Sequence, residues 1–387
     1  MAEKGKIGKF FASIVDLVTR DVELSNQNQV YLNDIDNLYP DRVEIIERNS
    51  VTALACSRKL KAFIVGRGFR NQRHNEMIVN PSKGTNGFAF LKNVADSLKT
   101  HAGVFVHVNY DIDGNVNYLD VLDYKKCRIS KYDAFGYPGK IYYRDWSKKS
   151  KFSLGSKSND RWFYPFNPDP EIIMDQRVND IRLNKSDSND VDNLVRDYRG
   201  QVFFLRLDES EIYPFAWIHS AYNDADTEYR VSLYRNSNFR CGFIEKTMII
   251  PNGLDKESRE EFDKAVKSWM GVENTSSVFV FKPEEHIEDL DNIIKTVSLK
   301  SSFDTERFKH DESSVANNIR KSYLSIPKIL IDPEDSFFGS SGEAFIEAIE
   351  YYNKETHFIR ESISYMMDSF FKGEDFAIDE LGDDQLA

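Results

Sequence analysis

The stretch GEAFIEAIEYYNKETHFIRESISYMMDSFF, residues 342–371, predicts the longest element of the fold. Its apolar residues recur at intervals of three and four, the spacing that places side chains on one side of an α-helix. The pattern continues for about seven helical turns, so one long helix with a buried stripe is expected. The residues of that stripe are Phe345, Ala348, Ile349, Tyr352, Ile359, Ile363, Met366, Met367 and Phe370.

The loop before this helix, DSFFGSSG at residues 335–342, carries two adjacent phenylalanines among small residues. Because such a loop does not bury aromatic side chains easily, these residues suggest a specific role. The sequence FGSSG departs from the G-x-S-x-G pattern of a nucleophile elbow, which argues against a catalytic serine. Ser340 or Ser341 is better explained as the cap of the following helix.

The composition predicts a folded chain with a sizeable core. Of the 387 residues, 41% are hydrophobic and 13% aromatic, and the length suggests two or three domains. No apolar run approaches the roughly 18 residues of a membrane-spanning helix. Residues 1–22 are expected to form an amphipathic helix or a mobile arm rather than a signal peptide, because Asp16 interrupts a short apolar run.

Cysteine usage and charge restrict the class of protein further. Cys56, Cys127 and Cys241 lie far apart and form no metal-type pair or disulfide framework, so reduced core residues made in a cytoplasm are expected. The net charge of −12 argues against a protein that grips nucleic acid through a basic surface. It is compatible with a protein that lets DNA pass, because tight phosphate contacts would act as friction.

The first half of the chain predicts helices followed by strands. Ser50 is placed to cap a helix over Val51–Val65, which Gly66 and Gly68 end, and a second helix is expected over about 86–101. Alternating apolar and polar residues then predict a β-meander. Its strands are expected at 104–110, 116–122, 127–130 and 139–146, with a further strand at 200–207.

The second half predicts long helices around a small module. A helix of about 25 residues is expected to begin at Pro214, and another is expected over about 303–324, before Pro327. Between them, segments 242–250, 255–270 and 276–282 predict a strand, a helix and a strand. The last 15 residues hold six acidic and no basic residues and are expected to form a solvated end. The expected fold class is α+β.

Local motifs predict no active site. VGRGFR at 65–70 lacks the lysine and following helix of a phosphate loop and is better explained as a helix-ending turn. PEEHIEDLD at 283–291 has no metal-ligand spacing, and the seven histidines are scattered. RWFYPFNP at 161–168 has aromatic residues of the kind that stack on bases, but core packing is the preferred interpretation. No catalytic residue, metal or cofactor is therefore predicted.

The order of five segments between about residues 39 and 371 is informative. They are LYPDRVEIIERNSVTALACSRKLKAFIVGRGF, THAGVFVHVNYDIDGNVNYLDVLDYKKCRI, PFAWIHSAYNDADTEYRVSLYRNSNFRCGFI, DKESREEFDKAVKSWMGVENTSSVFVF and IRKSYLSIPKILI. Their succession resembles that of tailed-bacteriophage portal proteins, the head-to-tail connector family that threads DNA through one capsid vertex. The order, rather than any single motif, carries this resemblance.

The resemblance implies a portal-like fold with a mixed α/β wing, long stem helices, a small β-α-β clip and a long C-terminal helix. A clip of about 45 residues is near the size below which a domain needs partners, which agrees with subunits that form a ring. The implied divisions are an N-terminal wing 1–213, first stem helix 214–240, clip 241–290, second stem helix and return 291–326, channel (tunnel) loop region 327–341, long wing helix 342–372 and acidic C-terminal tail 373–387.

The resemblance also implies three groups of contact residues. Channel-side cations are expected at Lys309, Arg320 and Lys321 of the second stem helix. The implied DNA-channel loop consists of Asp335, Ser336, Phe337, Phe338, Gly339, Ser340, Ser341 and Gly342. The clip residues expected to dock the packaging motor are Asp255, Glu257, Arg259, Lys264 and Lys267.

The implied function is a non-enzymatic dodecameric ring at the unique capsid vertex, through which double-stranded DNA is packaged, retained and ejected. Its implied partners are other copies of the chain, DNA, the major capsid protein, the terminase large subunit and neck, adaptor or tail proteins, with no membrane. The chain would be made in the host bacterial cytoplasm and end in the virion. Two alternatives stay open: another virion component, such as an adaptor or capsid subunit, and an enzyme acting on nucleic acid or the cell envelope.

Overall fold

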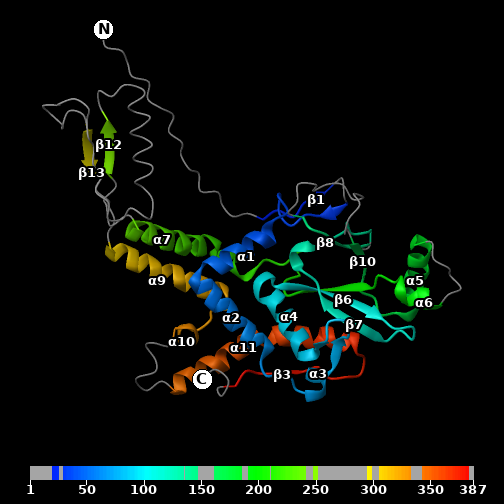
Figure 1. The fold of residues 1–387 in the computed structure, drawn as a ribbon. Helices are drawn as coiled ribbons and strands as arrows, with labels where there is room; N and C mark the ends of the chain where they lie inside the picture. The colour runs from blue at the N-terminus through cyan, green and yellow to red at the C-terminus, as the bar shows by residue number, and fades with distance from the viewer. Residues whose placement is uncertain are drawn as a thin grey trace, which may run out of the picture.

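The computed structural model describes residues 20–25, 29–134, 136–146, 161–184, 191–209, 211–240, 247–251, 294–298, 305–332 and 342–382. Within these residues, helices and a six-stranded sheet share one body. Helices α7 (Tyr222–Arg240) and α9 (Thr305–Ser322) project from one end of it (Figure 1). The combination of long helices with a mostly antiparallel sheet confirms the predicted α+β class.

The helical part of the body starts with two consecutive helices, α1 (Tyr39–Asn49) and α2 (Val51–Val65). Ser50 separates them and caps the second, since its hydroxyl accepts the backbone N–H of Ala53 at 3.0 Å. At the other end of α2, Gly66 takes a positive φ of 53° that favours glycine. The predicted cap and the helix-ending turn are both confirmed.

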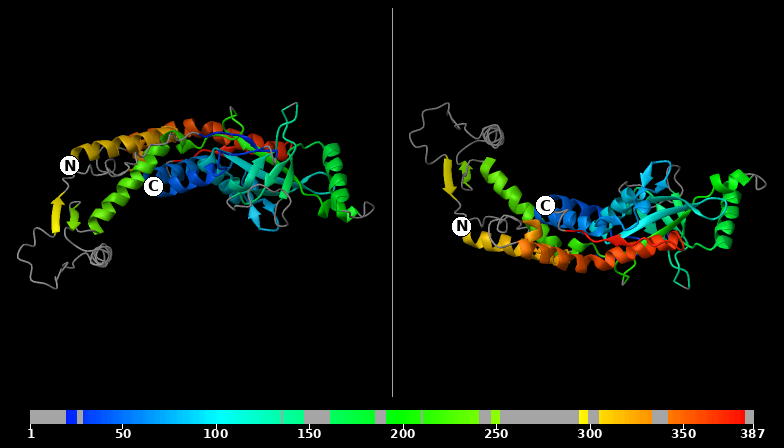
Figure 2. Two further views of the ribbon diagram at one scale, coloured as in Figure 1. Left: turned by 90° about the horizontal axis from the view of Figure 1, so that it is seen from above. Right: turned by 90° about the horizontal axis from the view of Figure 1, so that it is seen from below.

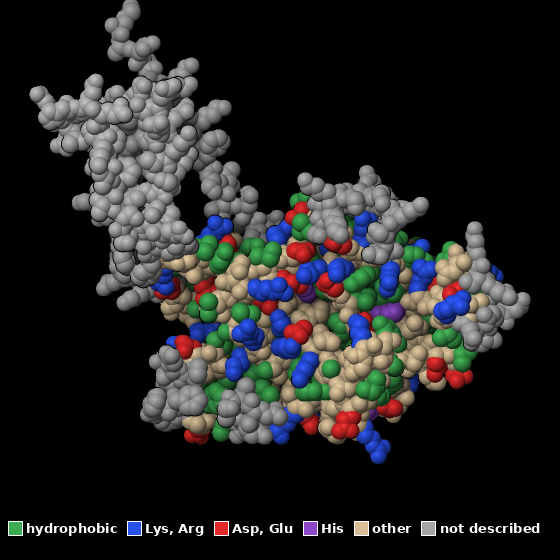
Figure 3. Space-filling view, viewed as in Figure 1, with side chains coloured by type: hydrophobic (Ala, Val, Ile, Leu, Met, Phe, Trp, Pro, Cys, Tyr) green, Lys and Arg blue, Asp and Glu red, His purple; other side chains and the backbone are tan. Residues whose placement is uncertain are grey.

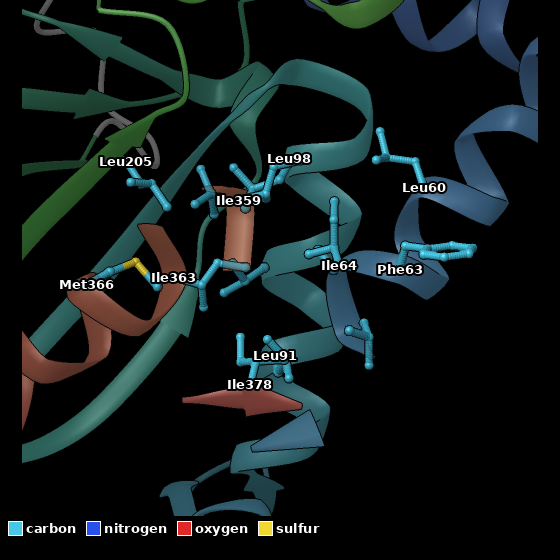
Figure 4. Packing of buried hydrophobic residues seen from close by; sticks show 14 of the residues in the cluster. Leu60, Phe63, Ile64, Leu91, Leu98, Leu205, Ile359, Ile363, Met366 and Ile378 are labelled. Carbon is cyan, nitrogen blue, oxygen red and sulfur yellow. The ribbon is translucent and has the colours of Figure 1, made fainter. Parts of the chain in front are cut away.

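The main core lies between α2, α4 (Gly87–His101) and α11 (Gly342–Phe370) (Figure 4). The Phe63 ring of α2 meets the Tyr352 ring of α11 edge-on, with 4.8 Å between ring centroids. Every residue of the predicted α11 stripe is buried except Phe345, which is partly buried against the same core. The long helix and its apolar face are thus confirmed.

The six-stranded sheet has the order β7-β6-β11-β10-β9-β8, so the predicted β-meander is wrong. β6 and β7 form one hairpin, and β8 and β9 form another. β10 and β11 lie between the two hairpins, so β7 and β8 are at opposite edges of the sheet. The spacing of strands along the sequence predicts hairpins, but it does not show that strands from later in the chain pair between two hairpins. The strands are β6 (Gly103–Tyr110), β7 (Val116–Val121), β8 (Cys127–Ile129), β9 (Ile141–Tyr143), β10 (Arg161–Pro165) and β11 (Gln201–Arg206).

β10 and β11 are parallel and are joined through α5 (Pro170–Asn184) and α6 (Val191–Arg196) at the far end of the body (Figure 1). A parallel pair needs such a crossover, which here is helical. The sequence analysis missed α5 because its apolar residues do not form a stripe: Ile173 is buried, whereas Leu183 is 60% exposed.

The aromatic segment 161–168 packs inside the body, as predicted. Phe163 is buried in the sheet core, and the Phe166 ring lies edge-on to the rings of Phe203 and Phe370, with centroids 5.1 and 5.3 Å away. These contacts join the sheet to the end of α11.

The predicted start of the first long helix at Pro214 is wrong. Residues before α7 form a 3₁₀ turn, η2 (Trp217–Ala221), and the α-helix begins only at Tyr222. Tertiary hydrogen bonds hold the chain there: the Trp217 indole donates to Leu98 O at 2.9 Å, and the Ala216 N–H donates to the Tyr39 hydroxyl at 3.3 Å. Helix propensity near Pro214 is therefore overridden by docking onto α1 and α4.

The predicted solvated C-terminal tail is wrong for residues 373–382, which we call the C-terminal strap. Phe376, Ile378 and Leu381 are buried in the main core despite the acidic residues around them. Strand β14 (Ile378–Asp379) pairs antiparallel with β3 (Gly68–Phe69). The strap therefore completes the core, and its acidic side chains occupy the positions between buried apolar residues.

Gly66 allows the strap to lie against the end of α2. A Cβ atom at Gly66 would come within 2.0 Å of the carbonyl oxygen of Asp379. From the other side, the buried Arg360 guanidinium donates to Phe63 O at 2.9 Å and to the Glu380 carboxylate at 3.1 Å. One arginine thus joins α11, α2 and the strap.

Smaller elements complete the described part of the chain. Cys56 and Cys127 are buried and free, as predicted, whereas Cys241 lies outside the described residues, as do residues 1–19. A search of the described helices finds none with the length and apolar character needed to cross a membrane. The short elements are β1 (Leu24–Ser25), β2 (Val30–Tyr31), α3 (Gln72–Glu76), β4 (Ile78–Asn80), β5 (Thr85–Asn86), η1 (Tyr124–Lys126), α10 (Lys328–Ile331), β12 (Thr247–Pro251) and β13 (Ile294–Ser298).

Candidate DNA-channel elements

α7 and α9 form an antiparallel pair whose base is buried and whose outer part is not. Ala225 near the start of α7 and Ile319 near the end of α9 are fully buried in the body. Beyond Ala225, none of the α7 side chains that the structure describes is buried, and Leu233 is 48% exposed. The pair extends away from the body (Figure 1), and the described part of the same chain leaves about half of the Leu233 side chain uncovered.

The base of the pair is fixed by Glu228 of α7. Its carboxylate accepts hydrogen bonds from the Thr52 hydroxyl at 2.7 Å and the Thr52 N–H at 3.2 Å. It also accepts a hydrogen bond from the Ser50 hydroxyl. Glu228 therefore provides a second cap for α2, where the helix dipole favours negative charge. Sequence reasoning missed this residue because its partners are 176 and 178 positions away. Further out, Arg235 of α7 and Glu312 of α9 form an ion pair.

A two-stranded ribbon lies beyond the helix pair. β12 and β13 pair antiparallel from Thr247 with Ser298 to Pro251 with Ile294. The sequence analysis predicted β12 but not β13, which lies in the segment assigned to the second stem helix and its return. The predicted helix 255–270 and strand 276–282 lie outside the described residues. The same is true of the predicted docking residues Asp255, Glu257, Arg259, Lys264 and Lys267.

The three predicted channel cations do not share one side of α9. Arg320 is half-buried and donates a hydrogen bond to Asn317. It also lies close to Cys56. Burial raises the pKa of the Cys56 thiol to about 12, while the positive charge of Arg320 acts to lower that pKa. Lys321 is exposed. Successive helical residues are about 100° apart, so Lys321 faces a different side from Arg320. The side chain of Lys309 lies outside the described residues. Their roles stay a prediction, and one channel face can hold only part of the set.

The predicted channel loop is defined by its two ends. α10 ends at Ile331 beside the start of α11, and Leu330 anchors it to the main core. Asp335, Ser336, Phe337, Phe338, Gly339, Ser340 and Ser341 lie outside the described residues, so their roles stay a prediction.

Gly342 is the one member of this loop set that the structure describes, and it forms the first residue of α11. A Cβ atom there would meet no atom of the described structure within 4 Å. We expect Gly342→Ala to raise the stability of α11 by about 0.5–1 kcal/mol, because alanine loses less backbone entropy on folding. Thermal unfolding followed by circular dichroism would measure this; a loss of stability would show that the loop requires glycine at its end.

Two open depressions mark the described surface. The larger, of about 520 Å³, lies between α3 and the C-terminal strap, where His74 Nε2 is 2.9 Å from the Glu374 carboxylate. The smaller, of about 270 Å³, lies beside α1, where Glu44 contacts Lys125 at 3.0 Å and His101 at 3.5 Å. Among the described residues, no group of three or more His, Cys, Asp or Glu is placed to hold a metal ion.

Glu44 gives a pH-dependent prediction. Burial opposes its ionisation, but hydrogen bonds and charges from His101 and Lys125 dominate and lower the pKa of Glu44 to about 2 from 4.5. A carboxylate with a lowered folded-state pKa stabilises the fold above its unfolded pKa and loses that contribution as the pH falls. We therefore expect the melting temperature of the wild type to fall between about pH 4.5 and 2 more steeply than that of Glu44→Gln. Glu209→Gln, at an exposed position, is the control and should keep the wild-type profile.

The chain is similar to solved chains from a virion, a particle neck and a phage portal. The virion of a native gene transfer agent (GTA) particle gives a TM-score of 0.48 at 10% identity, covering 88% of this chain and 83% of that chain. The neck of the native GTA particle, computed with C12 symmetry, gives 0.46 at 11% identity, covering 89% and 84%. An HK97-family phage portal protein from Corynebacterium diphtheriae gives 0.43 at 8% identity, covering 85% and 90%.

No protein-family model matches the chain, and neither does any curated protein. The similarities to solved structures concern the fold alone, and at these identities and TM-scores none assigns a function. Function must therefore follow from the chain's own elements: the projecting helix pair, the ribbon beyond it, and the long helix behind the predicted loop.

Proposed function

We propose that this chain is a portal-type subunit: a non-enzymatic protein that forms a ring at one capsid vertex, through which double-stranded DNA is packaged, retained and ejected. The observation that carries the proposal is the projecting pair α7 and α9 with the β12–β13 ribbon beyond it (Figure 1). The order of these elements along the chain, a long helix, a ribbon, a second long helix and then α11, supports this interpretation.

The exposure of the outer part of α7 supports assembly. Most of the stability of a helix in a protein comes from packing an apolar face, yet the described side chains of α7 after Ala225 are half-buried or exposed. An isolated two-stranded ribbon is also only marginally stable in water. Both elements gain burial when copies of the chain stand side by side, and head-to-tail contacts that close produce a ring.

Charge supports passage rather than capture of DNA. Each copy carries a net charge of −12, and a ring adds these charges into one negative field. Contacts with phosphates would then be weak, independent of sequence and sensitive to salt. The energy for packaging would come from a separate terminase motor docked at the clip, and neck or tail proteins would later occupy that end. The major capsid protein would surround the wing, and the ring would end in the virion.

Assembly of the full chain tests the proposal. We expect light scattering and negative-stain images of the purified protein to show a closed ring with a central hole. Leu233→Glu should reduce the ring fraction at least tenfold without changing the melting temperature, because Leu233 is 48% exposed in the single chain and would be covered in the ring. Ile112→Glu, at a site 42% exposed in the β6–β7 turn, is the matched control and should assemble. A monomer with hydrolase activity would contradict the proposal.

A further inference from the structure

The outward side of α11 carries a row of exposed aromatic residues. Tyr351, Phe358 and Tyr365 are 44%, 40% and 72% exposed. Their seven-residue spacing places them on one side of the helix. Exposed aromatic residues in such a row are unusual on a surface that meets only water.

The same side of α11 is strongly acidic. Lys354 is its exposed lysine, whereas Arg360 turns inward and is buried. Glu361 pairs with His357 at 3.2 Å, but no ion pair holds Glu347 or Glu355 within the described residues. The exposed acidic residues of the helix are Glu343, Glu347, Glu350, Glu355, Glu361 and Asp368. We call these residues and the three aromatic ones the α11 face.

The outward side of α2 has the opposite character. From Arg48 to Arg73 the chain contains seven Arg and Lys residues and no Asp or Glu. Arg58 is exposed and Lys59 is half-buried, and within the described part of the chain neither has an acidic partner. Burial lowers the pKa of Lys59. Val51 is 76% exposed. Figure 3 looks onto this side and shows mostly basic side chains over α2.

Small residues make this side of α2 accessible to a second helix. Ala55 and Ala62 lie near Arg58 on the helix surface and are half-buried. On the adjoining α1, Ile45 is 59% exposed. We call Ile45, Val51, Ala55, Arg58, Lys59 and Ala62 the α2 face.

The two faces point away from each other. α2 and α11 touch through Phe63 and Tyr352. Arg58 lies about 140° around α2 from Phe63, and Tyr365 lies about 140° around α11 from Tyr352. Figure 2 agrees: α2, in blue, and α11, in orange to red, run along opposite sides of the helical part of the body in both views. One copy therefore cannot bring its own two faces together.

We infer that the α11 face of one copy docks on the α2 face of the next copy. This inference rests on the proposed ring and names its subunit contact. A second copy is the expected occupant because every chain carries two complementary surfaces. The α11 face has unpaired carboxylates and aromatic rings. The α2 face, on the opposite side, has unpaired cations and small apolar residues. Two different faces on opposite sides produce a head-to-tail contact, the type of contact that gives a ring when the rotation between neighbouring copies closes.

The contact has a defined chemistry. The aromatic row would cover Val51 and the alanines, and Arg58 would lie over an aromatic ring, where cation–π attraction adds to the burial of apolar area. Glu347 and Glu355 would flank the row and pair with cations of the next copy. Because these charges lie at the rim of a contact, salt should weaken the attraction between subunits.

Charge reversal tests the contact. We test two double variants separately: Glu347→Lys with Glu355→Lys, and Arg58→Glu with Lys59→Glu. Each is expected to lower the ring fraction at least tenfold at 50 mM salt, measured by light scattering. All four substitutions in one chain should restore rings, because both faces are then reversed. Asp113→Lys with Glu209→Lys, at exposed positions on the sheet side, changes the net charge as the Glu347 and Glu355 pair does and should leave the ring intact.

A second variant tests the aromatic row without any charge change. Tyr365→Ser, at a site 72% exposed in the single chain, should keep the melting temperature of the monomer and reduce ring formation several-fold. If each of the two reversed-pair variants, tested separately, forms rings as the wild type does, this inference is overturned and the proposed function is left standing. A wild-type chain that forms no ring would overturn both.

Discussion

Deleting Ser336–Ser341 is expected to leave the ring assembled and to abolish packaging or retention of DNA. The deletion removes Phe337, Phe338 and Gly339 from the predicted channel loop, while the anchors on both sides stay in place: α10 packs on α2 and α11, and α11 buries its stripe in the main core. Because α10 and α11 contact each other outside the deleted segment, the fold of the subunit should persist.

The measurement is nuclease-protected DNA per particle, with ring formation checked by negative-stain images. Replacing Phe337 and Phe338 by serine keeps the loop length and separates the aromatic contribution from the length of the loop. If these aromatic rings touch DNA or neighbouring loops in the lumen, the double substitution should impair retention more than entry. Normal packaging and retention in the deletion variant would refute the assignment of this loop to the channel.

Removing residues 373–387 is expected to unfold the subunit or leave it unable to assemble. Phe376, Ile378 and Leu381 of the C-terminal strap are each at most 7% exposed. Burying one such side chain contributes roughly 1.5–3 kcal/mol, so the three together contribute on the order of 5 kcal/mol. Total stabilities are about 5–15 kcal/mol. The truncation also removes Glu380 from the buried Arg360 guanidinium and strand β14 from β3.

A shorter truncation separates the strap from the acidic end. Removing residues 383–387 takes away two acidic residues, Asp383 and Asp384, and leaves the strap whole. This variant should keep the wild-type melting temperature, whereas the variant that lacks 373–387 should lose its cooperative transition in circular dichroism. Equal stability of the two truncated chains would show that the strap does not complete the core.

Some of the fold could be predicted because the deciding interactions are local. The Ser50 cap, the glycines after Val65 and the apolar stripe of α11 each act within one helix or one turn, and all are present in the structure. Of the candidate site, the sequence located the helix pair and the two ends of the predicted loop. The aromatic row of Tyr351, Phe358 and Tyr365 was not among the predictions, because only the structure shows that these residues are exposed.

Other features depended on contacts between distant segments. Glu228 caps a helix 176 positions earlier, and Trp217 delays the start of α7 by bonding to Leu98. The sheet order places β10 and β11 between two hairpins. No local pattern encodes such choices, because the free energy of a long-range contact appears only once the whole body has formed.

The sequence by itself determined where the capped helices begin and end and which side of α11 is apolar, since backbone hydrogen bonding and helical periodicity act over a few residues. Only the tertiary structure decided that the acidic C-terminal strap is buried, because its three apolar residues find a core that α2, α4 and α11 build together. It alone also set α2 and α11 on opposite sides of the helical part of the body (Figure 2), which separates the exposed basic residues of α2 from the exposed acidic and aromatic residues of α11. Charge on a helix is a local property, whereas the direction in which that charge points is set by packing.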